Sequence, residues 1–209
     1  MTLSRLPHKT VERLSQYRNA LMDCLESGKH FIFSHELGNI VHVTPVQVRR
    51  DLMLIGYSGT LRKGYDISEL IKLIGKILDP SEIQNIALIG IGNLGRAIIS
   101  HFNGKRSQLG IVAAFDNDPN KADRVINGVS CYHIDNLKDI VKRENVMMAI
   151  LTVPPEAAPH IAETLVFGGI KGIINFTGTP LKVPHNVYLE EYDIITSIEK
   201  TSYFTHKAV

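Results

Sequence analysis

Three glycines follow a short apolar stretch in the middle of the chain. Gly90, Gly92 and Gly95 form the pattern G-x-G-x-x-G directly after residues 86–89 and at the start of a helical stretch. In this setting the first glycine permits a tight turn, the second lets the backbone approach a pyrophosphate, and the third lets helix and strand pack closely. The helix N-terminus adds free N–H groups and a positive dipole end. The pattern predicts a dinucleotide site formed by Gly90, Ile91, Gly92, Asn93, Leu94 and Gly95.

An aspartate follows at the distance that this kind of site requires. Asp116 ends the second predicted strand, residues 111–115, and lies 21 positions after Gly95. A carboxylate there accepts hydrogen bonds from the adenosine ribose hydroxyls and repels a 2′-phosphate, which favours NAD over NADP. The alternative is a glycine turn that serves packing alone, followed by a solvated aspartate.

Two later strands end in residues that can complete such a site. The first ends at Thr152, Val153 and Pro154, and the second at Asn175 and Phe176. Ligands of open α/β sheets bind beyond the carboxyl ends of the strands, so we expect these residues to line the nicotinamide half. Ordinary loop chemistry would explain them equally well.

A second pattern, in residues 34–55, is typical of a helix–turn–helix. Ser34 begins a short helix, and Thr44-Pro45 supplies an N-cap and a first-turn proline for the next helix. The apolar residues of that second helix are Val46, Val48, Leu52 and Ile55.

Polar side chains at the start of that helix have the chemistry that reads DNA. Gln47, Arg49 and Arg50 can face outward, and such side chains recognise adenine and guanine edges or hold phosphates. Arg62 and Lys63, on a glycine-punctuated hairpin, would form a basic wing. A solvated helix face and turn is the alternative. The candidate DNA-binding residues are Thr44, Gln47, Arg49, Arg50, Arg62 and Lys63.

The histidines show no common arrangement. His101 ends the helix after the glycine loop, where it can interact with the helix dipole or approach the cofactor. His30, His35 and His42 lack metal-ligand spacing, so we expect no metal site. The chain also has no G-x-S-x-G, P-loop or paired-carboxylate pattern that would indicate catalysis.

The composition indicates a globular intracellular protein. Of the 209 residues 44% are hydrophobic and 21% charged, which excludes disorder, and the length fits two small domains. Cys24 and Cys131 lack CxxC spacing, which excludes a disulfide framework and fits a reducing compartment. There is neither a signal peptide nor an apolar run of about 18 residues, so we predict a soluble, cytoplasmic protein.

The pattern of the sequence changes near residue 80. Residues 1–63 contain nine Lys/Arg against five Asp/Glu, a balance of +4, whereas residues 64–209 contain fourteen against sixteen, a balance of −2. The first part has helical periodicity, with a first helix capped by Thr10 and stopped by Gly28, and a last one over residues 67–78. Asp79-Pro80 is the expected junction.

Beyond the junction, apolar strands alternate with helices, as in a parallel sheet covered on both faces. We expect strands at residues 86–89, 111–115, 146–153 and 172–176, and an amphipathic segment at residues 193–204. The predicted fold class is α/β, with a winged helix–turn–helix domain over residues 1–80, a Rossmann-type domain over 81–190 and a C-terminal helix over 191–209.

Read from end to end, the chain resembles the Rex family of bacterial redox-sensing transcriptional repressors. The resemblance is carried, in order, by L-P-H-K-T-V-E-R-L-S-Q-Y, V-T-P-V-Q-V-R-R-D-L, G-Y-S-G-T-L-R-K-G-Y, G-I-G-N-L-G-R-A, V-A-A-F-D-N-D-P, V-P-P-E-A-A, G-I-K-G-I-I-N-F and V-Y-L-E-E-Y-D-I. It implies a homodimer with an N-terminal winged helix, a C-terminal Rossmann domain and a final helix exchanged between subunits. It also implies binding to a palindromic operator when NADH is scarce.

The resemblance also implies roles for particular residues. Asp193 matches an aspartate that acts across the dimer in the NADH-bound state, near the nicotinamide. His101 stands where the family often has its tyrosine partner, so a pH-sensitive His–Asp pair could substitute, with Phe102 as another candidate. The family usually has Ala-Pro after Asn-Phe, whereas this chain has T-G-T-P at residues 177–180.

Two other functions fit parts of the sequence. A small NAD-dependent dehydrogenase would need a substrate domain and a general acid or base, but only about thirty residues follow the predicted sheet. A regulator that binds coenzyme A or NADP is the second, and Asp116 opposes NADP. We therefore expect a repressor with NADH and NAD as effectors and double-stranded operator DNA as partner, and not an enzyme.

Overall fold

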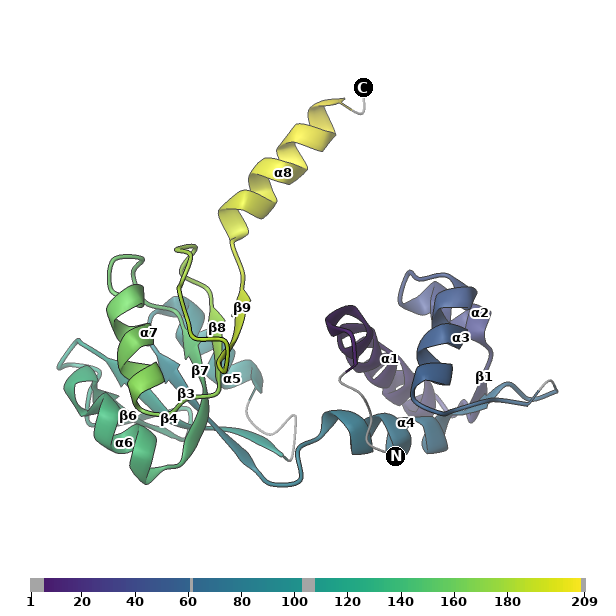
Figure 1. Ribbon diagram of the computed structural model, residues 1–209, viewed down its shortest axis with the longest axis horizontal. Helices are drawn as coiled ribbons and strands as arrows, with labels where there is room; N and C mark the ends of the chain where they lie inside the picture. Colours follow the sequence, from purple (N-terminus) through teal and green to yellow (C-terminus); the bar gives the residue numbers. More distant parts are fainter. Residues whose placement is uncertain (1–5, 61, 103–107, 208–209) are drawn as a thin grey trace. The chain divides into compact units, whose positions relative to one another are not determined.

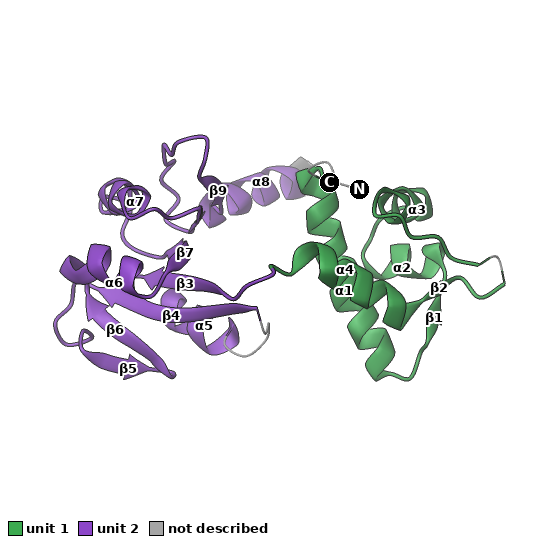
Figure 2. Cartoon of the chain, turned by 60° about the horizontal axis from the view of Figure 1, so that its bottom comes forward, with its two compact units in different colours: residues 1–80 green, residues 81–209 purple. Residues whose placement is uncertain are grey.

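The computed structural model describes residues 6–60, 62–102 and 108–207, and the chain divides into two compact units. The first comprises residues 1–80 and the second residues 81–209 (Figure 2). Each unit has hydrophobic clusters of its own.

The first unit is helical with a small two-stranded sheet. Its elements are α1 (His8–Glu26), β1 (Phe31–Ile32), α2 (Ser34–Ile40), α3 (Pro45–Leu54), β2 (Tyr65–Asp66) and α4 (Ile67–Leu78). β1 and β2 pair antiparallel, and a bridge between Thr60 and Gly64 closes the hairpin that leads into β2. This is a winged helix–turn–helix, in which α2 and α3 form the pair and Thr60 and residues 62–64 belong to the wing.

The local sequence explains where α3 and α4 begin. The Thr44 hydroxyl accepts a hydrogen bond from the Gln47 N–H at 3.2 Å, and Pro45 follows as the first helical residue. The Asp66 carboxylate accepts one from the Glu69 N–H at 2.9 Å.

The prediction that Thr10 caps α1 is wrong. The helix begins at His8, after Pro7, so Thr10 lies inside its first turn. Thr10 is 3% exposed and its hydroxyl faces Asp51 at 3.4 Å. Thr10 is a polar residue of the core. The sequence suggested a cap because threonine is common both as an N-cap and as a buried residue with a hydrogen-bonded hydroxyl.

The apolar residues of α3 do not share one side. Val48, Leu52 and Ile55 are buried, but Val46 is 56% exposed. Residues two positions apart lie on nearly opposite sides of an α-helix, so Val46 and Val48 cannot both face the core. Val46 therefore belongs to the outward face, beside Arg49 and Arg50.

The second unit is a seven-stranded sheet between helices (Figure 1). The strand order is β5-β6-β4-β3-β7-β8-β9, and all neighbours are parallel except β5 and β6. The elements are β3 (Gln84–Ile89), α5 (Asn93–Phe102), β4 (Leu109–Asp116), β5 (Arg124–Ile126), β6 (Val129–His133), η1 (Ile134–Asn136), α6 (Leu137–Arg143), β7 (Val146–Leu151), α7 (Ala158–Phe167), β8 (Gly172–Asn175), β9 (Tyr188–Glu191) and α8 (Ile194–Lys207).

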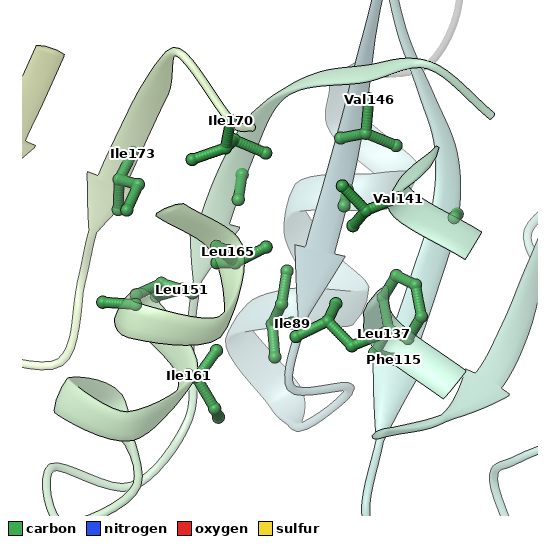
Figure 3. Close-up of a cluster of buried hydrophobic side chains, with 14 of the residues drawn as sticks. Ile89, Phe115, Leu137, Val141, Val146, Leu151, Ile161, Leu165, Ile170 and Ile173 are labelled. Atoms are coloured by element: carbon green, nitrogen blue, oxygen red, sulfur yellow. The ribbon is translucent and has the colours of Figure 1, made fainter. Parts of the chain in front are cut away.

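The central strands are apolar along their whole length because both faces of the sheet are covered. On one face Ile89, Phe115 and Leu151 pack against α6 and α7 through residues such as Leu137 and Leu165 (Figure 3). On the other face a second cluster includes Ile99 of α5. This two-faced burial is the Rossmann-type arrangement that the continuous apolar strands predict.

The sequence did not predict five elements of this unit. β5, β6, η1, α6 and β9 lie outside the expected strands and helices. β5 and β9 are the edges of the sheet, and their residues are mostly half-buried or exposed. Edge strands lack the apolar signal that marks a central strand, and α6 has only seven residues.

The last helix, α8, presents uncovered apolar side chains. Ile194, Ile195, Ile198 and Phe204 are between 58% and 65% exposed. Among the described residues, no helix is long and apolar enough to cross a membrane.

Candidate functional site

The glycine loop sits where three strand ends meet. The Gly90 N–H donates to the Phe115 carbonyl at 2.8 Å, and the Thr152 N–H donates to the Ile89 carbonyl at 2.9 Å. The Thr152 hydroxyl also donates to the Gly90 carbonyl at 2.7 Å. These bonds join the ends of β3, β4 and β7 into one rim. Because the chain turns from β4 on one side of β3 to β7 on the other, this rim is the switch point where ligands of such sheets bind.

The three glycines have different reasons for being glycine. Gly90 has a φ of +95°, and a Cβ there would lie 2.6 Å from the Thr152 carbonyl oxygen. A Cβ on Gly95 would collide with the Gly90 carbonyl oxygen, so the helix can pack this closely on the strand only because residue 95 is glycine. Gly92 has no atom within 4 Å of its Cβ position. The space beside Gly92 is therefore open to a ligand, directly before the N-terminus of α5.

A cavity of about 620 Å³ lies against this rim. Its lining includes six of the predicted cofactor residues: Gly90, Gly92, Asp116, Thr152, Val153 and Pro154. The sequence did not identify the rest, which include Asn117 and Lys121 after β4, Ile134 of η1, and His160 and Ile161 of α7. Lys121 had a usable signal, since it follows Asp116 by five residues in D-N-D-P-N-K.

Asp116 is buried and makes its hydrogen bonds within the protein. It is 7% exposed, and its carboxylate accepts from the N–H groups of Ile91 (2.7 Å) and Asp118 (3.0 Å). Lys121 Nζ lies 3.2 Å from the same carboxylate. Burial alone would raise the pKa of Asp116, but these N–H groups and Lys121 outweigh it and lower the pKa. The carboxylate is thus ionised. It holds the glycine loop through the hydrogen bond from the Ile91 N–H and forms an ion pair with Lys121.

Asn175 supports the loop that follows β8. It is 2% exposed, and its amide donates to the Thr179 carbonyl at 2.8 Å and to Glu191 at 3.2 Å. Its oxygen accepts from the backbone and the hydroxyl of Thr177, at 3.0 and 2.7 Å. The segment T-G-T-P is therefore folded around Asn175, with Gly178 at a φ of +72°.

The remaining predicted cofactor residues do not line this cavity. Phe176 stacks on Tyr192 with ring centroids 5.0 Å apart. Asp193 lies directly before α8, where it accepts hydrogen bonds from the N–H and hydroxyl of Thr196, at 3.1 and 2.5 Å. His101 is exposed at the end of α5, whereas Phe102 is half-buried against the apolar cluster beneath that helix. Ile91 is fully buried, Asn93 is exposed and Leu94 is 40% exposed.

The candidate DNA-binding residues lie on α3 and the wing. Arg49 and Arg50 are exposed, and Arg49 donates to the Ser34 hydroxyl at the start of α2 at 2.9 Å. On the wing Arg62 and Lys63 are exposed, and the Lys63 ammonium lies 5.3 Å from the centre of the Phe31 ring. The helix thus carries arginines on its outward face, as a recognition helix requires.

A buried carboxylate ties α3 to α1. Asp51 is 0% exposed, and Arg13 donates to it through two nitrogens, at 2.6 and 2.7 Å. The Tyr17 hydroxyl donates at 2.9 Å and the Gln47 amide at 3.0 Å. Burial would raise the pKa of Asp51, but the hydrogen bonds from Arg13, Tyr17 and Gln47 outweigh it and lower the pKa. Sequence analysis missed this network because Asp51 is separated from Arg13 by 38 positions.

Comparison with known proteins agrees with this two-part arrangement. Residues 5–52 match a family model described as a putative DNA-binding protein N-terminus, and residues 81–179 match one described as a CoA binding domain. A redox-sensing transcriptional repressor Rex of Geobacillus kaustophilus is 36% identical over 200 residues, covering 96% of this chain and 93% of the relative.

Solved structures give the same result. A crystal structure of RSP in complex with β-NAD+ and operator DNA has a TM-score of 0.89 at 31% identity, covering 98% of this chain and 94% of that chain. RSP in complex with β-NADH has a TM-score of 0.85 at the same identity, covering 98% and 96%. RSP is described as a Rex-family repressor. On its identity to curated repressors over nearly its whole length, the chain belongs to the Rex family of redox-sensing transcriptional repressors.

Proposed function

We propose that this chain binds a palindromic operator through α3 and the wing, binds NADH or NAD+ in the cavity of its second unit, and leaves the DNA when NADH occupies that cavity. The observation that carries the proposal is the presence of both sites in one chain: an outward arginine-bearing α3 and an open glycine loop. RSP, which shares the fold over 98% of this chain, was captured with NAD+ and operator DNA together.

The cavity suggests how the dinucleotide lies. Its adenosine belongs near Asp116, Asn117 and Lys121, and its pyrophosphate belongs over Gly92 at the N-terminus of α5. The nicotinamide would then extend past Thr152 toward the end of β8. Because the Asn175 side chain is already hydrogen-bonded within the protein, we assign it to holding the loop rather than to touching the ring.

We assign dimer formation to the C-terminal segment, residues 191–209. The exposed isoleucines of α8 would be covered by a second copy, and an exchanged helix is one way to cover them. A dimer presents two copies of α3, and palindromic half-sites require their spacing to be about 34 Å or a multiple of it. A modest rotation between subunits is therefore enough to lose the operator.

We place the redox switch at Asp193 and His101. NADH and NAD+ differ at the nicotinamide, and a ligand shifts an equilibrium only by its difference in affinity for the two states. In this proposal Asp193 of one subunit pairs with His101 of the other in the NADH-bound state, giving up part of its bonding to Thr196.

One titration tests the function. Binding of the full-length protein to a palindromic DNA pool is followed by fluorescence anisotropy while NADH, NAD+, NADPH or coenzyme A is added in separate arms. We expect release by NADH at lower concentration than by any other arm. Release by coenzyme A alone would support the second family model instead, and turnover of NADH without DNA binding would support a dehydrogenase.

The proposed partners also suggest where the protein acts. Operator DNA and the NADH pool that reports cell metabolism meet in the bacterial cytoplasm, and we propose that location for this chain.

A further inference from the structure

The Gln47 amide is held in one orientation. Its Nε2 donates to Asp51 Oδ1 at 3.0 Å, inside a half-buried contact on α3. An ionised carboxylate offers only acceptors, so the amide can meet it only with its nitrogen. The amide oxygen Oε1 is therefore turned away from Asp51. Reversing the amide would set two oxygens against each other at a buried charge.

Asp51 cannot move to accommodate a reversal. Arg13 donates to both oxygens of Asp51, and the hydroxyls of Tyr17 and Thr10 also donate to this carboxylate, at 2.9 and 3.4 Å. The carboxylate is 0% exposed and joins α1 to α3. Bidentate arginine contacts fix geometry more strictly than single hydrogen bonds do. The orientation of Gln47 is thus imposed by a rigid network outside the helix surface.

The fixed orientation of the amide affects base recognition, because a glutamine whose amide can rotate does not distinguish between bases. Its amide can present either an acceptor or donors, and so can meet any base edge in the major groove. In that groove adenine N6 and cytosine N4 are donors, whereas guanine O6 and thymine O4 are acceptors. Gln47 stands in the first turn of α3, the part of a recognition helix that meets base edges.

We propose that Asp51 is a positioning residue for base recognition: by holding Gln47 Nε2, it makes Oε1 an outward acceptor and selects a base whose exocyclic amine lies in the major groove, adenine or cytosine, at one position of each half-site. The inference rests on the proposed operator binding. The oxygen end of the Gln47 amide contacts the base, and the buried Asp51, which does not contact DNA, determines this orientation.

The test uses the full-length protein and a panel of duplexes. Once an operator is selected, each half-site position is substituted in turn, and affinity is measured for wild type and Gln47→Ala. The position at which Gln47→Ala removes base preference defines the contact. There we expect wild type to prefer adenine or cytosine over guanine and thymine by roughly two- to tenfold, the range expected of a single hydrogen bond.

Base analogues make the result independent of any variant's folding. Replacing adenine by purine, or cytosine by 2-pyrimidinone, removes the amine alone, and wild type should lose most of the preference. Asp51→Asn, whose amide accepts either orientation of Gln47, should lose the preference at that same position while keeping its affinity for random DNA. Thr10→Val is the matched control, because it removes another Asp51 hydrogen bond without touching Gln47; it should keep the preference.

The outcomes separate this inference from the proposed function. If the protein binds an operator and NADH releases it, but wild type tolerates loss of the amine or prefers guanine or thymine at that position, the inference is overturned and the function stands. If Gln47→Ala changes no base preference, the inference is likewise overturned. If no operator is bound, both are overturned.

Discussion

Each unit contains a buried, ionised aspartate, and the two carboxylates are stabilised by different cations. Asp51 and Asp116 are both ionised, and hydrogen bonds and a cation hold the pKa of each below its ordinary value. Asp51 is 0% exposed and meets Arg13 through two nitrogens. Asp116 is 7% exposed at the edge of a cavity and meets Lys121 through one, at 3.2 Å.

The choice of cation matches the openness of each site. The guanidinium of arginine is planar and forms paired hydrogen bonds, which suits a closed network that fixes one helix against another. The ammonium of lysine is a single flexible charge, which can stay beside Asp116 or move toward a ligand in the cavity. The closed site therefore sets architecture, whereas the open site can respond to what binds.

The largest effect should come from breaking the closed network. Asp51→Ala leaves the half-buried Arg13 and the buried Tyr17 hydroxyl without their shared acceptor, and removing one member of a buried ion pair costs about 3–5 kcal/mol. We expect the first unit to lose that much free energy of unfolding in urea, followed by circular dichroism. Glu12→Ala, which removes a surface pair with Lys9, is the control and should cost about 0.5 kcal/mol or less. Equal losses would mean that Asp51 is not structurally required.

The second prediction is that acid weakens the same network, because protonation of Asp51 lowers the stability of the first unit. The pKa of Asp51 is lower in the folded state than in the unfolded chain. The stability that Asp51 contributes is therefore present above about pH 4, the ordinary aspartate value, and is lost as pH falls through the folded pKa. Hydrogen exchange of α1 and α3 amides between pH 6 and 3 measures this loss. Asp51→Asn should flatten the slope, and an unchanged slope would assign it to other carboxylates.

The open site should give a smaller, ligand-dependent effect. Lys121 offsets the charge of Asp116, so Lys121→Ala leaves an uncompensated carboxylate where a 2′-phosphate would lie. We expect NADPH affinity to fall relative to NADH by about 1 kcal/mol, or roughly fivefold, at low salt. Calorimetry with both nucleotides measures the ratio. Lys171→Ala, just before β8, is the matched control; the same change there would remove Lys121 from nucleotide selection.

The sequence predicted the elements that carry long apolar patterns and strong caps. The limits of α4 at residues 67–78 and the Thr44 cap agree with the structure, because each is set by neighbouring residues. The glycine loop and its following helix were likewise readable from spacing alone.

What the sequence could not show are partnerships across long separations. Asp51 carries no signal of its own until the fold places Arg13 beside it. Asp116 was predicted as a cofactor residue, but its hydrogen bond with the Ile91 N–H appears only in the structure. Lys121 differs from these two cases, because it lies only five positions after Asp116 and its spacing was readable from the sequence. The predictions for Thr10 and Val46 failed for a related reason, since each residue type fits two environments. The contact with Asp51 decides for Thr10, and the helical position opposite the buried Val48 decides for Val46.

The smallest prediction concerns that exposed valine. Val46 is 56% exposed in the first turn of α3, where an apolar side chain can meet the thymine methyl group. Val46→Ala removes two methyl groups from an already open position, so the fold should be unaffected and operator affinity should fall about two- to fourfold, because burying one such group is worth about 0.8 kcal/mol. An operator in which deoxyuridine replaces each thymine in turn tests the contact: at one position wild type should lose affinity and Val46→Ala should not. If the losses at every position are equal in the two proteins, Val46 does not touch a thymine, and base recognition by α3 is left to its polar residues.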